Sequence, residues 1–174
     1  MTVAASNLIN ATLLGYGGDT GPAVDNPAVA LAPDGSYAVA WTTVTELASQ
    51  LRNGELKVRH YPASGATTLA RTVESTGVQA PAEITMDGMG NYTLLYMKHR
   101  LGTRNIMGLS LRRYSGDNAN ALGPAVQVVP QEQRYYWDRI GIKASASGNL
   151  VVAWTDGAGT VSYTHLTLPT ILLV

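Results

Sequence analysis

The sequence predicts an all-β protein built from repeated units of four antiparallel strands, and three observations lead to this fold class. A segment with the pattern of a β-hairpin occurs three times, at intervals of about 55 residues. Each copy carries Asp-Gly or Gly-Asn at its centre, where a tight turn needs residues that tolerate positive φ. No longer stretch combines helical periodicity with capping residues. With 45% hydrophobic residues in 174, the chain has the composition of a globular protein.

The hairpins span residues 26–43, 80–98 and 138–156, and they align with one residue of slack before the central glycine. Each reads as an apolar strand, a turn and a second strand. The alignment superimposes three turn glycines (Gly35, Gly90 and Gly148) and three aromatic residues (Trp41, Tyr96 and Trp154).

The second strand of each hairpin is apolar on both of its faces. In the first copy Tyr37, Val39 and Trp41 point to one side, and Ala38 and Ala40 point to the other, because successive side chains of a strand alternate. The third copy repeats this pattern. We therefore expect these strands to lie between two packed layers.

A third and a fourth strand follow the hairpin in the first two copies. Residues 52–65 resemble residues 104–117, and each segment reads as a strand that ends in a turn. Apolar stretches at 66–75 and 123–131 supply the fourth strand. Four antiparallel strands at this period are typical of a β-propeller blade. A β-sandwich with accidental internal similarity is the alternative, and three aligned hairpins argue against it.

The predicted architecture is a β-propeller fragment of about two and a half four-stranded blades. Because a propeller ring closes with about four to eight blades, we expect the natural chain to continue, with its remaining blades as partners of this segment. Apolar faces and open strand edges should make the isolated chain prone to association. The expected division is an outer strand of a preceding blade or an N-terminal extension (1–25), blade repeat 1 (26–79), blade repeat 2 (80–137), a truncated blade repeat 3 (138–159) and a non-native tail (160–174).

Two motifs connect the repeat to a known group of proteins. The pattern A-x-x-x-D-G-x-Y-x-V-x-W runs from Ala30 to Trp41, and V-R-H-Y-x-x-x-G runs from Val58 to Gly65. Together they resemble the tandem repeats of large secreted or surface-attached bacterial proteins, over roughly residues 20–157. The chain departs from that pattern because it has no Phe and carries Tyr96 in place of Trp. The resemblance implies an extracellular or cell-surface location and a non-catalytic role.

The C-terminal segment breaks the repeat. After Gly159, where a third strand like KVRHY is expected, the chain reads VSYTHLTLPT. This segment resembles a translated sequencing-library adapter, in which GTCTCTTATACACATCTGACGCTGCCGACG would encode Val161 to Thr170. The remaining residues fit the continuation of that adapter through its index to a stop codon. We therefore expect residues from about 160 onward to be foreign to the natural protein.

Composition excludes several classes of function. Twelve Lys and Arg balance twelve Asp and Glu, so the chain has no overall field that would attract nucleic acid or anionic lipid. The absence of cysteine removes disulfides, thiolate nucleophiles and cysteine zinc sites. No apolar run is long enough to span a membrane, and the first residues lack the basic region of a signal peptide. We expect neither nucleic-acid binding nor membrane insertion.

The residues that most often carry chemistry form no catalytic or metal-binding pattern. His60 and His99 have no His, Asp or Glu at a ligand spacing, and His165 belongs to the suspected tail. A Ser-His-Asp triad can be assembled only by free choice among many serines. The sequence therefore predicts no catalytic residues, no metal site and no cofactor.

Two glycine-rich or Asx-rich segments are interpreted as loops. GYGGDTGP (15–22) lacks the helix N-terminus that a phosphate cradle needs. SGDNANALG (115–123) lacks the bidentate Glu of a calcium loop, and it reads as a turn between the third and fourth strands.

Topology indicates the best candidate for a binding surface. In a four-stranded meander the longer segments 43–54, 98–105 and 131–138 converge at the end opposite the tight hairpin turns. Aromatic rings beside guanidinium groups at that end could stack on a sugar or bind an acidic polymer. The alternative is that Tyr136 or Trp137 packs between blades and the charged residues form a solvated face. The residues of this predicted loop-end site are Lys98, His99, Arg100, Arg104, Tyr135, Tyr136 and Trp137.

Two classes of function remain open. The first is a non-catalytic binding or structural repeat module of a secreted or cell-surface bacterial protein, with a carbohydrate or an acidic polymer as ligand. The alternative is a fragment of a propeller-fold glycosidase or lyase whose catalytic residues lie on missing blades, with Asp138 and Glu132 as remnants of its acidic site. A convergent acidic cluster in the complete gene would favour the enzyme, and further blades of unchanged pattern would favour the module.

Overall fold

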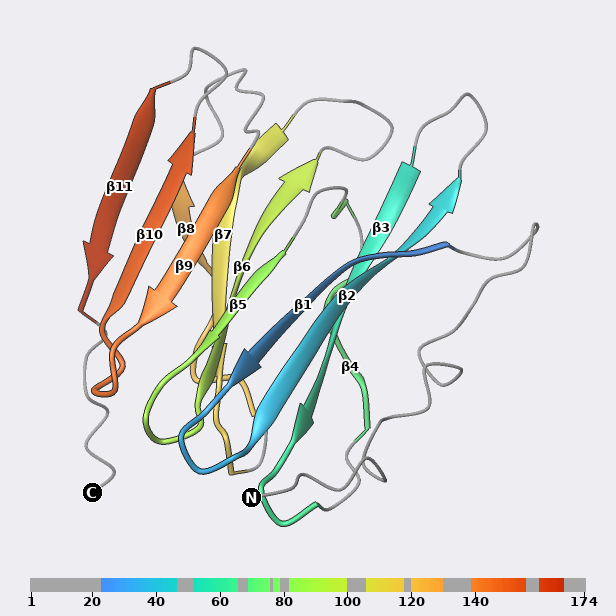
Figure 1. Ribbon diagram of the computed structural model, residues 1–174. Coiled ribbons are helices and arrows are strands. Elements are labelled where there is room, and N and C mark those ends of the chain that lie inside the picture. The colour runs from blue at the N-terminus through green and yellow to red at the C-terminus, as the bar shows by residue number, and fades with distance from the viewer. Residues whose placement is uncertain are drawn as a thin grey trace.

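The computed structural model shows a stack of three antiparallel β-sheets (Figure 1). The described residues form eleven strands and no helix, which confirms the predicted all-β class. They contain no helix that is both long and apolar enough to cross a lipid bilayer. The structure describes residues 23–46, 52–65, 69–75, 77–78, 82–99, 106–117, 120–129, 139–155 and 160–167.

Each sheet is a meander in which strands that follow one another in the sequence are paired. Sheet I consists of β1 (Ala23–Leu31), β2 (Tyr37–Glu46), β3 (Arg52–Tyr61) and β4 (Arg71–Glu74). Sheet II consists of β5 (Glu83–Met86), β6 (Tyr92–His99), β7 (Ile106–Tyr114) and β8 (Val126–Val129). Sheet III consists of β9 (Ile140–Ala144), β10 (Leu150–Thr155) and β11 (Val161–Leu166).

The sheets differ from the predicted units at two boundaries. β1 begins at Ala23, ahead of residue 26, because β2 is long enough for Ala23 to pair with Val44. β11 lies within the predicted tail and pairs with β10 along its whole length, in the position of a third strand. The adapter origin of this tail concerns its coding DNA and stays a prediction.

The three predicted hairpin turns have the same backbone geometry. Their aligned glycines adopt positive φ, at 89° for Gly35, 78° for Gly90 and 88° for Gly148. In each turn the amide of this glycine donates to the carbonyl three residues earlier, with N···O distances of 3.0, 3.2 and 3.0 Å. Because side chains with a Cβ rarely adopt this backbone conformation, glycine is required at the aligned position.

Each sheet has two faces, which we name by the alignment of the repeats. The leading face carries Tyr37, Val39 and Trp41 in sheet I, and the trailing face carries Ala38 and Ala40. The aligned leading-face residues are Tyr92, Leu94 and Tyr96 in sheet II, and Leu150, Val152 and Trp154 in sheet III. The aligned trailing-face residues are Thr93, Leu95 and Met97 in sheet II, and Val151, Ala153 and Thr155 in sheet III.

The sheets pack in one direction, with the trailing face of each against the leading face of the next. Ala38, Ala40 and Leu56 of sheet I share a buried core with Leu94 and Tyr96 of sheet II. A second core joins the trailing face of sheet II to the leading face of sheet III; its members include Leu95, Met97, Leu109, Leu111, Ile142, Leu150 and Val152. β6 is buried on both faces, as its sequence predicted.

The closest contacts between successive sheets are made by their first strands. β1 contacts β5, and β5 contacts β9, so that the first strands of the three sheets lie side by side (Figure 1). The ends of β2, β6 and β10 lie at one end of the stack, and the three tight hairpin turns lie at the other. This arrangement matches the predicted separation between hairpin turns and longer loops.

Backbone hydrogen bonds also join the sheets. The amide of Val78 donates to the carbonyl of Gly54 in β3 at 3.0 Å, while Val78 forms a bridge with Lys98 in β6. The amide of Gly88 donates to the carbonyl of Ala146 at 3.0 Å and so joins sheet II to sheet III. These bonds fix how closely the backbones of neighbouring sheets approach each other.

Replacing Gly54 with alanine is expected to lower the free energy of unfolding by about 3 kcal/mol, the upper part of the usual range for overpacking. A Cβ on Gly54 would overlap the carbonyl oxygen of Val78, so backbone would have to move. Gly141→Ala in β9 is the matched control, because a Cβ there meets no atom within 4 Å. Urea denaturation of both variants measures the difference, and equal destabilisation would contradict the close approach at Gly54.

Candidate functional site

The predicted loop-end site falls mostly outside the described residues. Lys98 is the one member whose side chain the structure describes, and for His99 it describes the backbone, which pairs with Ile106. The other members (Arg100, Arg104, Tyr135, Tyr136 and Trp137) lie outside the described residues, as do Glu132 and Asp138 of the enzyme alternative. The proposed convergence of these residues therefore stays a prediction.

Lys98 connects two sheets. Its Nζ lies 2.8 Å from Oε2 of Glu74, so β6 of sheet II forms an ion pair with β4 of sheet I. The two side chains are 33% and 21% exposed. Because Glu74 already neutralises this ammonium group, a ligand carboxylate at Lys98 would compete with an ion pair between the sheets.

The interface between sheets I and II contains a column of stacked rings. The ring centroid of His60 lies 5.5 Å from that of Tyr92, and the centroid of Tyr92 lies 5.2 Å from that of Tyr114. The two rings of each pair are nearly parallel. Arg112 lies over Tyr114, and its Nη1 donates to the carbonyl of Val73 at 3.0 Å. These groups come from both sheets, so the column holds the two sheets together.

His60 is shielded from water in this column, with 5% of its surface exposed. Burial lowers the pKa of its imidazole, and the carboxylate of Asp34 opposes this shift in part. Among the described residues, no group of three or more His, Asp or Glu side chains could hold a metal ion. Because His60 is buried and stacks on Tyr92, its side chain serves to pack sheet I against sheet II.

Lowering the pH below 6.5, the ordinary pKa of histidine, is expected to reduce stability through His60. Its folded-state pKa is depressed, so the unfolded chain binds the proton more readily, and stability falls as the pH drops from 6.5 toward the folded-state value. His60→Phe keeps a ring in the column but cannot titrate. Unfolding in urea from about pH 7 to about pH 5 should show a smaller loss for this variant. An identical loss would show that His60 does not contribute.

A similar group of residues lies on the leading face of sheet I, but there no strand of the described chain covers it. Tyr37 and Tyr61 stack at 4.6 Å, and the guanidinium group of Arg59 lies 5.2 Å from the Tyr61 ring. Leu31 pairs with Tyr37 in the same row and is 70% exposed. The structure thus shows aromatic rings beside a guanidinium group on this face, in addition to the group predicted at the loop end, which stays a prediction.

The two aromatic groups are equivalent by strand register. Tyr37 pairs with Tyr61 as Tyr92 pairs with Tyr114. Arg59 and Arg112 stand two residues before their tyrosines. The signal that could have revealed this group is the repeated R-x-Y motif, because residues two apart in a strand share a face.

Asp87 forms the centre of a polar cluster at the hairpin end of sheet II. Its carboxylate accepts hydrogen bonds from the amides of Met89 and Asn91 at 2.9 and 3.0 Å, and from Nδ2 of Asn91 at 2.9 Å. It also forms an ion pair with Arg113 of β7. The side chain of Asp87 is 2% exposed. Since these donors saturate the buried carboxylate, the cluster supports the fold and offers no free group for chemistry.

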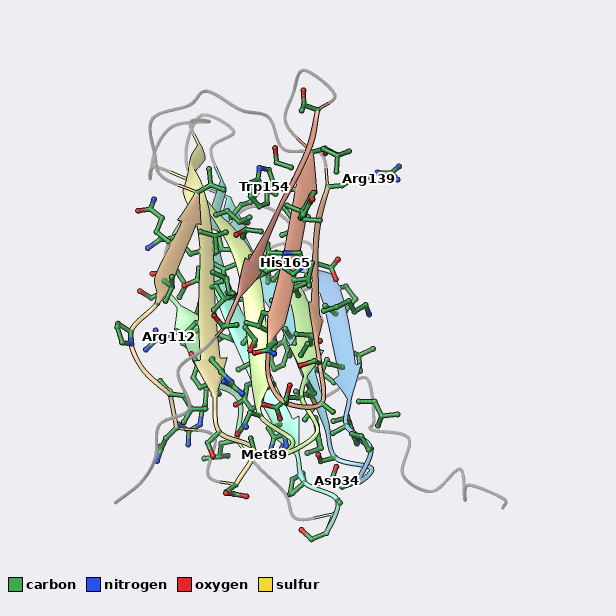
Figure 2. The ribbon with its side chains drawn as sticks, turned by 90° about the vertical axis from the view of Figure 1, so that its left-hand side faces the viewer. Asp34, Met89, Arg112, Arg139, Trp154 and His165 are labelled. Atoms are coloured by element: carbon green, nitrogen blue, oxygen red, sulfur yellow. The ribbon has the colours of Figure 1, made fainter. Side chains whose placement is uncertain are left out.

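A second aspartate, Asp34, lies at the hairpin end of the stack, in the turn between β1 and β2. Asp34 accepts hydrogen bonds from the amide and the hydroxyl of Ser36, at 2.9 and 2.7 Å, which lower the pKa of its carboxyl. Figure 2 shows Asp34 and Met89 at this end of the stack, and Trp154 and Arg139 at the opposite end. The acidic residue at this position of the turn is therefore an Asx-type capping group.

The two segments interpreted as loops have different outcomes. Ser115 donates from its amide to the carbonyl of Asn120 at 2.9 Å, and Leu122 donates to the carbonyl of Arg113 at 2.9 Å. These bonds confirm a turn between β7 and β8 in the described part of residues 115–123. The segment 15–22 lies outside the described residues.

Comparisons with known proteins place the chain in no established family. No protein-family model matches the sequence, and no curated protein matches it. The described residues themselves define an all-β arrangement of three antiparallel sheets, with a buried core between each sheet and the next.

Proposed function

We propose that the chain is a non-catalytic binding or structural repeat module of a secreted or cell-surface bacterial protein, and that its sheets are blades of a β-propeller. The observation that supports this proposal is the repetition of one packing scheme, in which trailing faces meet leading faces twice through aligned residues. The side-by-side first strands also agree with a propeller, whose innermost strands line a common axis.

The described polar side chains support a structural role. Lys98 is paired with Glu74 between sheets, and Asp87 is saturated by amides and Arg113. His60 packs against Tyr92. An acid, a base or a nucleophile needs an accessible group with a tuned environment, and these side chains are used for holding sheets and turns in place.

The ligand in this proposal is a carbohydrate or an acidic polymer at the loop end of the stack. The supporting observation is that the described ends of β2, β6 and β10 lie together at that end (Figure 1). The sequence places Arg100 and Arg104 in the segment that follows β6, and Trp137 in the segment that follows β8, which runs parallel to β6 in the meander. Arginine and aromatic side chains recognise sugars and carboxylates through stacking and bidentate hydrogen bonds.

The test is binding of the whole chain to xylan, dextran, polygalacturonate and heparin, measured by affinity electrophoresis and calorimetry. We expect at least one polymer in the gel to retard the protein, with Trp137→Ala and Arg100→Ala each weakening that binding about tenfold, the effect of losing roughly 1.4 kcal/mol. Arg71→Ala is the control, since this exposed arginine in β4 lies outside the predicted site. If neither variant alters the binding that is detected, the loop-end site is wrong.

A further inference from the structure

We propose that the leading face of sheet I binds the trailing face of sheet III in a second copy of this chain, so that copies associate head to tail. Each of these faces carries exposed apolar side chains, and on the leading face of sheet I they lie on β1, whereas Trp41 of β2 is 5% exposed. On the leading face of sheet I, Val29 and Leu31 are 68% and 70% exposed. On the trailing face of sheet III, Val151, Val161 and Tyr163 are 41%, 66% and 69% exposed.

The occupant is inferred from continuity with the two interfaces inside the chain. Sheet I contacts sheet II through its trailing face, and sheet II contacts sheet III in the same way. The only faces that this rule leaves without a partner sheet among the described strands are the leading face of sheet I and the trailing face of sheet III. One further application of the rule joins these two faces between copies.

The leading face of sheet I already has the residues that such a contact uses. Its Tyr37–Tyr61 pair with Arg59 is equivalent by register to the Tyr92–Tyr114 pair with Arg112. In sheet II that group is covered by the trailing face of sheet I, with His60 stacked on Tyr92. The half-buried group in sheet I, which no described sheet covers, therefore has the residues for the same kind of partner.

The trailing face of sheet III supplies the opposite half of the contact. Val151 pairs with His165 in the same register in which Ala38 pairs with His60. In the proposed contact His165 of one copy would lie on Tyr37 of the next. Figure 2 shows His165 in the middle of sheet III, away from both ends of the stack. Residues 161–166 form β11 of this chain, whatever DNA encodes them, so they are present in the protein that the experiment uses. Val151 lies in β10, outside the predicted tail.

This interface joins two different surfaces. Two variants that are each blocked on one surface should therefore associate when they are mixed, and an interface between identical surfaces would not show this behaviour. Leu31→Glu blocks the leading face of sheet I, and Val151→Glu blocks the trailing face of sheet III. Each variant alone should remain a monomer of 18.4 kDa in sedimentation equilibrium. An equimolar mixture should form a complex of twice that mass, because the intact trailing face of one variant binds the intact leading face of the other. The complex should grow no further, since its two remaining faces are the blocked ones. The wild-type chain should form larger assemblies as its concentration rises.

Met89→Glu is the matched control, because Met89 is 69% exposed at the turn between β5 and β6 and lies on neither face. It should associate like the wild type. If Val151→Glu loses the circular-dichroism spectrum of a β-sheet protein, Tyr163→Glu on the exposed edge strand replaces it. The proposal is overturned if the wild type stays monomeric up to about millimolar concentration. It is equally overturned if either blocked variant still self-associates, or if the mixture stays monomeric while the wild type associates.

A cross-linking experiment checks the register independently. The chain has no cysteine, so single introduced cysteines react without background. His165→Cys copies mixed with Tyr37→Cys copies should be joined by a short bismaleimide, and neither variant should cross-link alone. Cross-linking within one variant would contradict the head-to-tail arrangement.

Discussion

Replacing Tyr96 with alanine is expected to lower the free energy of unfolding by about 3–5 kcal/mol, the cost of truncating a large aromatic side chain in a core. Tyr96 is fully buried on the leading face of sheet II, in the core that this sheet shares with sheet I. Its burial raises the pKa of its hydroxyl to about 12, which reflects how far the group is removed from water. Loss of the ring would leave a cavity between two sheets, so both sheets would be affected.

Two variants show whether the ring or its position matters. Tyr96→Phe keeps the ring and should change stability by less than about 1 kcal/mol, since it is nearly the same shape. Tyr163→Ala truncates the same residue type at a site that is 69% exposed in the single chain, and should be close to neutral when unfolding is measured at a concentration too low for copies to associate. Denaturation in urea at neutral pH measures all three. A cost for Tyr96→Ala no greater than that for Tyr163→Ala would contradict the packing of sheet I on sheet II.

Replacing Arg113 with methionine is expected to cost about 3 kcal/mol, because it leaves the buried carboxylate of Asp87 without its cationic partner. The side chains of Asp87 and Arg113 are 2% and 17% exposed, so water cannot readily replace the guanidinium group. The cost lies at the lower end of the range for broken buried pairs because Asp87 keeps its hydrogen bonds to Met89 and Asn91. The guanidinium group also lies beside Gly148 of sheet III, so the loss extends to the next sheet.

Lys57→Met is the matched control for Arg113→Met. Lys57 pairs with Glu55 at 3.1 Å on the surface of β3, where the side chains are 31% and 33% exposed. An exposed ion pair of this kind contributes at most about 1 kcal/mol because water and salt screen it. Thermal and urea unfolding of the two variants should therefore separate them clearly. Equal losses would mean that the Asp87–Arg113 pair is no more important than a surface pair.

Much of the fold follows from local patterns that the chain repeats. The strands, the turns at Gly35, Gly90 and Gly148, and the four-stranded composition of sheets I and II were predicted from alternation and turn chemistry. These features depend on residues that are close in the sequence, since a hairpin turn selects its own register. The strand position of residues 161–166 was not predicted, because its sequence differs from the third strands of the other units.

The candidate site was less accessible to prediction. Lys98 was expected to face a ligand, and its partner Glu74 lies on a different sheet that only the tertiary structure brings near. The link between Asp87 and Arg113 joins a turn to a third strand 26 residues later. Neither partner is marked by a local motif, so the pair could not be predicted from the order of residues along the chain.

By itself, the sequence determined the all-β class, the repeat and the apolar character of both faces of the central strands, because alternation and turn residues act within a few positions of the chain. The tertiary structure decided which faces meet. Trailing faces pack on leading faces, and this rule makes the Tyr92 group a buried contact, while no described sheet covers its half-buried equivalent at Tyr37. The two groups have nearly the same residues, so their difference comes from their order in the stack: sheet I covers the group in sheet II, and no described sheet precedes sheet I.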